Sequence, residues 1–188
     1  MLGAQLIGEI NDCGLTLEAK ELAQLIVKDG LQQRQRLICD RTLSQVADKK
    51  ARLMAERGMV MHVLGRSPNT ALRDAGFELP SYYGAAFSNQ VEAIAGGYSS
   101  AEDVWYAFKH SEAHRSHLLG EIPFYEEQDK MGVGFFRDYS TPHDYYWAVY
   151  ISKGRTVKPS PQFNTIPNKG TEMIAPTTKE KALPQTKQ

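Results

Sequence analysis

Three of the chain's five histidines lie in one short segment, KHSEAHRSHLL, which begins at Lys109. His110, His114 and His117 stand at i, i+4 and i+7, which is one face of a helix if that helix is unbroken. Imidazoles at i and i+4 can converge on zinc, but the strong motif of this kind, HExxH, is absent because Ser111 follows His110. Ser111 is also a favourable N-cap, and a helix break there would destroy the register. A local metal site and solvated or structural histidines both stay open.

Nucleophilic chemistry has weaker support. Ser111 and His114 are the types of a nucleophile and its base, yet the chain has no GxSxG elbow. Nothing near Cys39 indicates a lowered thiol pKa. Cys13 and Cys39 are the only cysteines, so they form a disulfide in an oxidising compartment or stay as two unpaired thiols.

His62 and Glu92 occupy more informative positions. His62 comes after a predicted helix and before LGRSPN, which places it in a loop, where polar residues often serve function. Glu92 lies inside the apolar run VEAIA. A carboxylate among apolar neighbours faces solvent or is buried with a partner. Glu92 is therefore an outward strand residue or meets a histidine across the fold.

Segments with helical periodicity lie before, between and after His62 and Glu92 in the sequence. It predicts helices from Thr16 to about Gly30, over 42–57 with Gly58 as the C-cap, over 69–75, and from Ser99 or Ser100, with a further turn or two from Ser111. The inner stripe of the second helix is Leu43, Val46, Ala47, Lys50, Leu53 and Met54.

Strand signals are concentrated near the end of the domain. Residues 131–138 (MGVGFFRD) and 145–152 (YYWAVYIS) predict a hairpin, and FSNQVEAIAGG predicts a short strand before it. This order predicts an α+β domain with helices packed over a small, mainly antiparallel sheet. We expect an irregular segment at 1–15, the domain at 16–154 and a disordered, proline-containing tail at 155–188.

The composition excludes some classes of protein. The 188 residues are 41% hydrophobic, and 22 basic side chains balance 22 acidic ones, so neither a nucleic-acid surface nor a polybasic membrane anchor is expected. No apolar run is long enough for a transmembrane helix. The start, MLGAQLIGEINDCG, does not resemble a signal peptide, which predicts a cytosolic protein or a mature chain.

Five segments carry a resemblance, in order. They are LSQVADKKARLMAERGMVMH, LRDAGF, NQVEAIAGG, AFKHSEAHRSHLL, and the pair MGVGFF and YYWAVYIS. Together they resemble the bacterial branch of the CAP superfamily (SCP domain), which includes cysteine-rich secretory proteins, antigen five and plant pathogenesis-related proteins. The resemblance covers about residues 31–153.

This resemblance implies an α-β-α sandwich with a cleft of two histidines and one or two acidic residues, which in several members binds a divalent metal such as zinc. His62 would be the first histidine, Glu92 the acid and His114 the second histidine. Two imidazoles completed by solvent make a weak, open site. The family also implies a secreted, periplasmic or cell-envelope protein.

The chain departs from the family pattern at several positions. Phe108 replaces the motif tryptophan, and Val91 and Ala93 flank Glu92 in place of the usual glycine and asparagine. The second acid has no clean match, so Glu102 and Asp103 are both candidates. Ser111 and Arg115, next to the motif histidine, are further candidates for the cleft.

The leading interpretation is a CAP-domain binding module that holds a divalent cation and a small apolar, lipid or protein partner. Four aromatic residues would line an apolar groove or lie in the core: Tyr82, Tyr83, Phe87 and Tyr98. The alternative is a metal-assisted hydrolase with Glu92 as general base, although two histidines are fewer than the three protein ligands usual in catalytic zinc sites. A third hypothesis is a cytosolic interaction domain.

Overall fold

The computed structural model describes residues 12–85 and 88–156. Within these ranges the helices are α2 (Leu17–Lys28), α3 (Arg41–Arg57), α4 (Pro68–Asp74), η1 (Ser81–Tyr83), α5 (Ala101–His110), α6 (Glu112–Leu119) and α7 (Pro123–Glu126). The strands are β1 (Ile38–Cys39), β2 (Phe77–Glu78), β3 (Glu92–Gly96), β4 (Lys130–Asp138), β5 (Asp144–Ser152) and β6 (Arg155–Thr156). No described helix is both long and apolar enough to cross a membrane.

The main sheet has four strands in the order β1-β4-β5-β3. The predicted hairpin is β4 and β5, which pair antiparallel with Gly132 opposite Tyr150. β3 joins the other edge of β5, also antiparallel, with Glu92 opposite Tyr150. Short β1 pairs parallel with β4, so the sheet is mixed.

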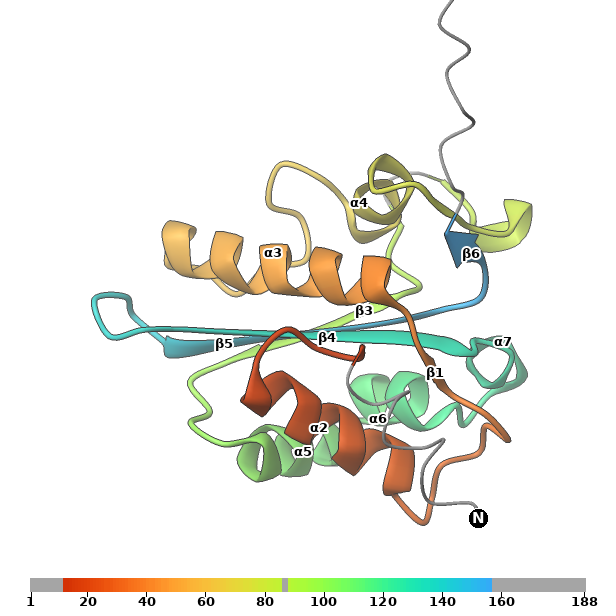
Figure 1. Ribbon diagram of the computed structural model, residues 1–188, viewed down its shortest axis with the longest axis horizontal. Coiled ribbons are helices and arrows are strands. Elements are labelled where there is room, and N and C mark those ends of the chain that lie inside the picture. Colours follow the sequence, from red (N-terminus) through yellow and green to blue (C-terminus); the bar gives the residue numbers. More distant parts are fainter. Residues whose placement is uncertain (1–11, 86–87, 157–188) are drawn as a thin grey trace, which may run out of the picture. The chain divides into compact units, whose positions relative to one another are not determined.

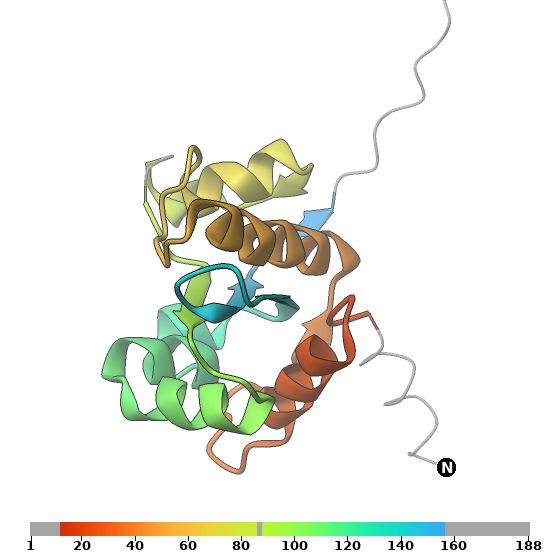
Figure 2. The same ribbon diagram turned by 90° about the vertical axis from the view of Figure 1, so that its left-hand side faces the viewer.

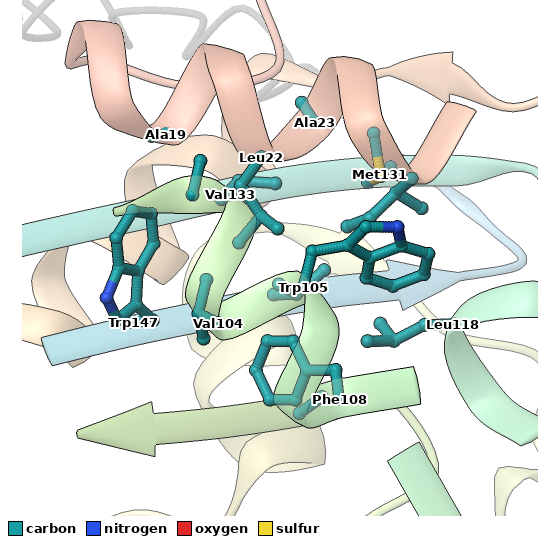
Figure 3. Packing of buried hydrophobic residues seen from close by; sticks show 14 of the residues in the cluster. Ala19, Leu22, Ala23, Val104, Trp105, Phe108, Leu118, Met131, Val133 and Trp147 are labelled. Atoms are coloured by element: carbon teal, nitrogen blue, oxygen red, sulfur yellow. The ribbon is translucent and has the colours of Figure 1, made fainter. Parts of the chain in front are cut away.

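Helices cover both faces of this sheet, as Figures 1 and 2 show, with α3 and α4 on one side and α2, α5 and α6 on the other. Successive strand residues point to opposite faces. Trp147, Val149 and Ile151 accordingly join the core with α2 and α5, while Tyr146, Ala148 and Tyr150 join the core with α3. Figure 3 shows the first core, where side chains from α2, α5 and the sheet meet. The protein is thus α+β, with helices on both faces of a small sheet.

Two glycines on β4 bring α3 unusually close to the sheet. A Cβ added to Gly132 would lie 2.1 Å from the backbone nitrogen of Ser44, and one added to Gly134 would lie 2.1 Å from the carbonyl carbon of Ala47. Side chains at these positions would push the helix away. The glycines therefore set the height of α3 above β5, where Lys50 meets Tyr150 and Glu92.

The predicted helices are confirmed, and their ends have clear chemical causes. Thr16, Asp40, Ser67 and Ser100 cap α2, α3, α4 and α5 through their side-chain oxygens. Gly58 ends α3 in the left-handed conformation. Ser111 has extended backbone angles and separates α5 from α6. The three histidines of the 110–117 segment therefore do not lie on one continuous helix.

Described structure extends slightly beyond the predicted limits of 16 and 154 at both ends. Arg155 and Thr156 form β6, which pairs antiparallel with β2, so the ordered domain continues past 154. At the other end the backbone nitrogen of Val133 donates to the carbonyl of Cys13, and Cys13 forms a disulfide with Cys39 of β1. The strands β1, β2 and β6 each have only two residues, which is too short for a sequence periodicity to predict them. Residues 1–11 and 157–188, which hold most of the predicted irregular segment and tail, lie outside the described residues.

Candidate functional site

Glu92 is the centre of a buried polar cluster. It is the first residue of β3, and its side chain has no exposed surface. One carboxylate oxygen, Oε1, lies 2.8 Å from Nδ1 of His62. The other, Oε2, accepts a hydrogen bond from the hydroxyl of Tyr150 and lies 3.6 Å from the ammonium of Lys50. The prediction that Glu92 meets a histidine across the fold is confirmed.

His62 is held in place from two directions. It lies in the loop after α3, and Lys50, two turns from the end of α3, donates a 2.6 Å hydrogen bond from Nζ to the carbonyl oxygen of His62. Its ring is held by Glu92, yet 43% of the side chain is exposed. Backbone and ring are both fixed while one edge of the imidazole faces solvent.

Two groups of opposite preference face Nδ1 of His62, the acceptor Glu92 and the donor amide of Asn89. The Oδ1 atom of Asn89 accepts from the backbone nitrogens of Val91 and Glu92, which fixes the orientation of the amide. The Nδ2 group, which can only donate, lies 3.0 Å from the Glu92 carbonyl and 3.1 Å from Nδ1 of His62. The carboxylate can only accept and makes the shorter contact, 2.8 Å against 3.1 Å, which favours a hydrogen on Nδ1 over the opposite preference of the Asn89 donor. His62 then carries its proton on Nδ1 and presents the Nε2 lone pair outward.

Lys50 supplies a cation and Tyr150 a hydrogen-bond donor to the buried carboxylate of Glu92. Lys50 is 7% exposed and Tyr150 is 1% exposed. Burial lowers the pKa of Lys50, and the charge of Glu92 opposes that shift. Burial, the charge of Glu92 and the hydrogen bond to it together raise the pKa of Tyr150 well above its usual value. A buried carboxylate needs such partners, since an unpaired charge in the interior is strongly destabilising.

His114 is the second histidine of the cleft. It lies in the first turn of α6, with Nδ1 2.9 Å from the hydroxyl of Ser111 and its ring 5.0 Å from that of Phe108. Burial, followed by the electrostatic interaction with His62, lowers the pKa of His114. A neutral imidazole at physiological pH is the form that can bind a metal.

The other two histidines of the segment have different surroundings. His110 is exposed, with its ring 3.9 Å from that of Tyr106. His117 is buried with its ring centroid 4.9 Å from that of Tyr125 and tilted to it, and burial lowers its pKa to about 3. His117 is therefore a neutral core residue, and His114 is the ring of the segment with both a neutral form and partial exposure.

These groups share a small cavity of about 190 Å³. It is lined by His62, Asn89, Gln90, Val91, Glu92, Ala113, His114, His117 and Tyr125. His62 comes from the loop after α3, Glu92 from β3 and His114 from α6, so the cavity lies where these three segments meet. The structure thus brings together the three residues on which the prediction depended most.

Four other predicted candidates take different places. Ser111 supports His114, as described. Arg115 lies at the surface and pairs with Glu121 at 2.8 Å. Asp103 bonds to Ser100 at the start of α5, and Glu102 lines a separate depression beside Trp105. None of Glu102, Asp103 and Arg115 lines the cavity, so the second acid implied by the resemblance is not supplied by these residues.

The predicted aromatic residues do not form one groove. Tyr83 is fully buried on the α3 side of the sheet, whereas Tyr98 packs against the core on the α2 side. Tyr82 is exposed and its hydroxyl donates to Glu127 at 2.6 Å. Phe87 lies outside the described residues.

Sequence reasoning missed Lys50, Asn89 and Tyr150 as parts of the site. Lys50 carried a signal, because a lysine on the apolar stripe of a helix must find a buried partner or extend to solvent. Asn89 and Tyr150 carried no comparable signal, since their roles depend on a turn geometry and a strand register that sequence does not give.

His62 and His114 are the partly exposed histidines that line this cavity. Among residues 12–85 and 88–156, no group of three or more histidine, cysteine, aspartate or glutamate side chains is arranged to hold a metal ion. Glu92 faces the Nδ1 side of His62 and orients its imidazole, as a carboxylate would do for a metal-binding histidine. His62 and His114 are the two groups that would contact an ion directly, and solvent would complete its coordination shell.

Comparisons with known proteins add a likeness of fold. No protein-family model matches the chain, and no curated protein matches it. Among solved structures, the chain is similar to an outer surface protein from Borrelia burgdorferi, with a TM-score of 0.53 and 22% identity over 72% of this chain and 88% of that chain. At this identity the likeness shows that the two chains share a fold.

Proposed function

We propose that the protein is a CAP-like binding module whose cleft holds a divalent cation weakly between His62 and His114. The observation that carries the proposal is the contact between Glu92 and Nδ1 of His62, which leaves Nε2 of His62 available in the cavity that His114 also lines. Three residues hold this pair in place. Lys50 donates to the carbonyl of His62, Asn89 donates to the carbonyl of Glu92, and Tyr150 donates to the Glu92 carboxylate. An orienting network around a half-exposed histidine is typical of a ligand site.

The geometry favours an orienting role for Glu92. The side chain has no exposed surface, and both oxygens are in contact with protein groups. A general base must reach the water that it deprotonates. A binding function is accordingly better supported than the metal-assisted hydrolase.

A location in the cell envelope or outside the cell is part of the proposal. The disulfide between Cys13 and Cys39 fits an oxidising compartment. The similar solved structure is described as an outer surface protein, which agrees with such a location.

Calorimetric titration of Zn²⁺ at neutral pH tests the cation site. We expect one ion to bind the wild-type protein and binding to be lost in both His62→Ala and His114→Ala. His110→Ala is the matched control, because it removes an exposed histidine that does not line the cavity. Absence of binding to the wild type, or its loss in His110→Ala alone, would overturn the proposal.

A further inference from the structure

β3 is an edge strand of the main sheet, because it is the last strand in the order β1-β4-β5-β3. Its hydrogen bonds to β5 show which of its backbone groups face the sheet. Val91 accepts from the backbone nitrogen of Ile151 at 2.9 Å, and the nitrogen of Gly97 donates to the carbonyl of Tyr145 at 2.9 Å. Bonded and non-bonded residues alternate along an antiparallel pair. The backbone groups of the even-numbered residues therefore point away from β5, toward the free edge: Glu92, Ile94 and Gly96.

Asn89 pairs with the first of these residues as a neighbouring strand would. Its Oδ1 accepts from the backbone nitrogen of Glu92 at 2.9 Å, and its Nδ2 donates to the carbonyl of Glu92 at 3.0 Å. In the part of the chain that the structure describes, no group hydrogen-bonds to the outward backbone atoms of Ile94 or Gly96. Backbone groups without a protein partner face water in folded proteins. Two donors and two acceptors are therefore open beside the position that Asn89 closes.

Both faces of β3 are covered, so its edge is the part that a partner can reach. Over one face, His62 contacts Glu92, and Val60 lies so close that a Cβ added to Gly96 would be 2.5 Å from it. Helices α5 and α6 cover the other face of the sheet (Figure 2). A single extended chain suits this approach. A second copy of the protein suits it less well, because helices cover both faces of its own sheet.

The sequence at this edge lacks the features that usually prevent strand pairing. Charged side chains and proline protect many edge strands, whereas residues 93–97 (AIAGG) contain neither. The loop that holds Val60 and His62 also presents three exposed apolar side chains, Met59, Met61 and Val63. Apolar side chains of a partner would be removed from water against them. These features favour an uncharged partner segment with β-branched side chains.

We propose that the free edge of β3 binds an extended, uncharged peptide segment of a partner protein, which pairs with Ile94 and Gly96 as an added strand. Main-chain hydrogen bonds supply most of the affinity in this mode of recognition, and side chains adjust the preference. The paired segment ends at Asn89, which already occupies the position beside Glu92. The pairing needs no ion between His62 and His114, so it is independent of the proposed cation site.

The test uses the peptide acetyl-Thr-Val-Thr-Val-Thr-amide with the full-length protein in EDTA, which removes any cation. NMR titration should give saturable shifts of the Ile94 and Gly96 amides, and the hydrogen exchange of these two amides should slow as the peptide saturates the protein. The peptide N-methylated at its two valines should still bind, because one of its edges keeps its donors. The peptide N-methylated at every residue should not bind. Binding of that fully methylated peptide, or no saturable binding of the parent peptide, would overturn the proposal.

Two substitutions of one residue locate the site. Ile94→Pro removes an outward N–H that makes no bond to β5, and it should abolish binding of the peptide. Ile94→Ala loses the buried side chain but keeps the N–H, so it should bind as the wild type does. Melting temperatures verify that both variants fold. Unchanged binding by folded Ile94→Pro would overturn the location. If Ile94→Pro does not fold, the amide shifts decide, and shifts that leave out Ile94 and Gly96 would overturn it equally.

Sedimentation of the protein without peptide tests the other occupant of this edge. We expect a monomer at all concentrations. A concentration-dependent dimer in which the Ile94 and Gly96 amides become protected would assign the edge to a second copy and overturn the peptide proposal.

Discussion

Nδ1 of His62 lies 2.8 Å from Oε1 of Glu92, which joins a half-exposed imidazole to a carboxylate that has no exposed surface. The carboxylate belongs to the sheet and the imidazole to a loop. The contact therefore fixes the side chain of His62, a loop residue, to strand β3. Because Lys50 binds the carbonyl of His62 and faces Glu92, the same ammonium links both ends of this contact.

Replacement of Glu92 by glutamine tests the balance of charge in this cluster. Glu92→Gln keeps the shape and leaves the Lys50 ammonium buried without its anion, so we expect a loss of about 3 kcal/mol in the free energy of unfolding. Glu92 raises the pKa of Lys50 against the effect of burial, so the variant should lower that pKa further. A lysine with a depressed pKa is destabilising below that pKa, and the penalty declines as pH rises toward the unfolded value near 10.4.

Urea denaturation of Glu92→Gln at pH 7 and pH 9.5 measures both effects. The deficit relative to wild type should be smaller at pH 9.5. The double variant Lys50→Met/Glu92→Gln serves as the control, because it removes the unpaired cation and should recover part of the stability at pH 7. A deficit that is independent of pH and of Lys50 would contradict the charge balance.

Two buried tyrosines on β5 provide a matched comparison. The hydroxyl of Tyr150 donates to Glu92, while the hydroxyl of Tyr146, on the same face of the same strand, has no hydrogen-bond partner among the described residues. Tyr150→Phe should destabilise the protein by about 2 kcal/mol, because a bond to a charged group is lost. Tyr146→Phe should be neutral or stabilising. Chemical denaturation measures the free energy of unfolding of both variants. Equal losses in the two variants would show that the hydrogen bond to Glu92 does not contribute to stability.

The chain itself predicted most of the helices, because their ends depend on local chemistry. Thr16, Ser67 and Ser100 are capping residues at the positions where helices begin. The hairpin was equally clear from β-branched and aromatic residues on both sides of a turn. The short strands β1, β2 and β6 were not predictable, because each consists of two residues whose pairing depends on distant partners.

The three central residues of the site were predictable from the sequence, and the residues that hold them in place were not. His62, Glu92 and His114 follow from the resemblance of several motifs in order, and the structure brings them to one cavity. Glu102 and Asp103 were proposed because acidic residues near that motif are expected, yet both lie in the first turn of α5, where their charge suits the helix N-terminus. Local helix chemistry accounts for them without any role in the cleft.

The close packing of α3 on β4 can be tested at a single glycine. Gly134→Ala would place a methyl carbon 2.1 Å from backbone atoms of Ala47, and backbone cannot move aside as a side chain can. We expect a loss of about 3 kcal/mol or more, together with weaker contact between Lys50 and Glu92.

Gly30→Ala is the control for this substitution, because nothing lies within 4 Å of the added carbon and Gly30 is not among the glycines with positive φ. It should be neutral or stabilise by about 0.5 kcal/mol. Thermal melts compare the two variants with the wild type. Equal melting temperatures for Gly134→Ala and Gly30→Ala would contradict the close approach of α3 to β4.

The buried His117 should make the protein sensitive to mild acid. Burial lowers its pKa to about 3 in the folded state, against about 6.5 when unfolded. Below pH 6.5 the unfolded chain therefore binds a proton that the folded chain does not, and stability falls as pH falls until about pH 3. By pH 5 the loss from this residue should reach about 2 kcal/mol.

His117→Gln can still donate to the carbonyl of Ile151 but cannot titrate, so its stability should decline less between pH 7 and pH 5. Denaturation midpoints of both proteins at the two pH values measure the difference, and parallel declines would show that other groups cause the acid sensitivity.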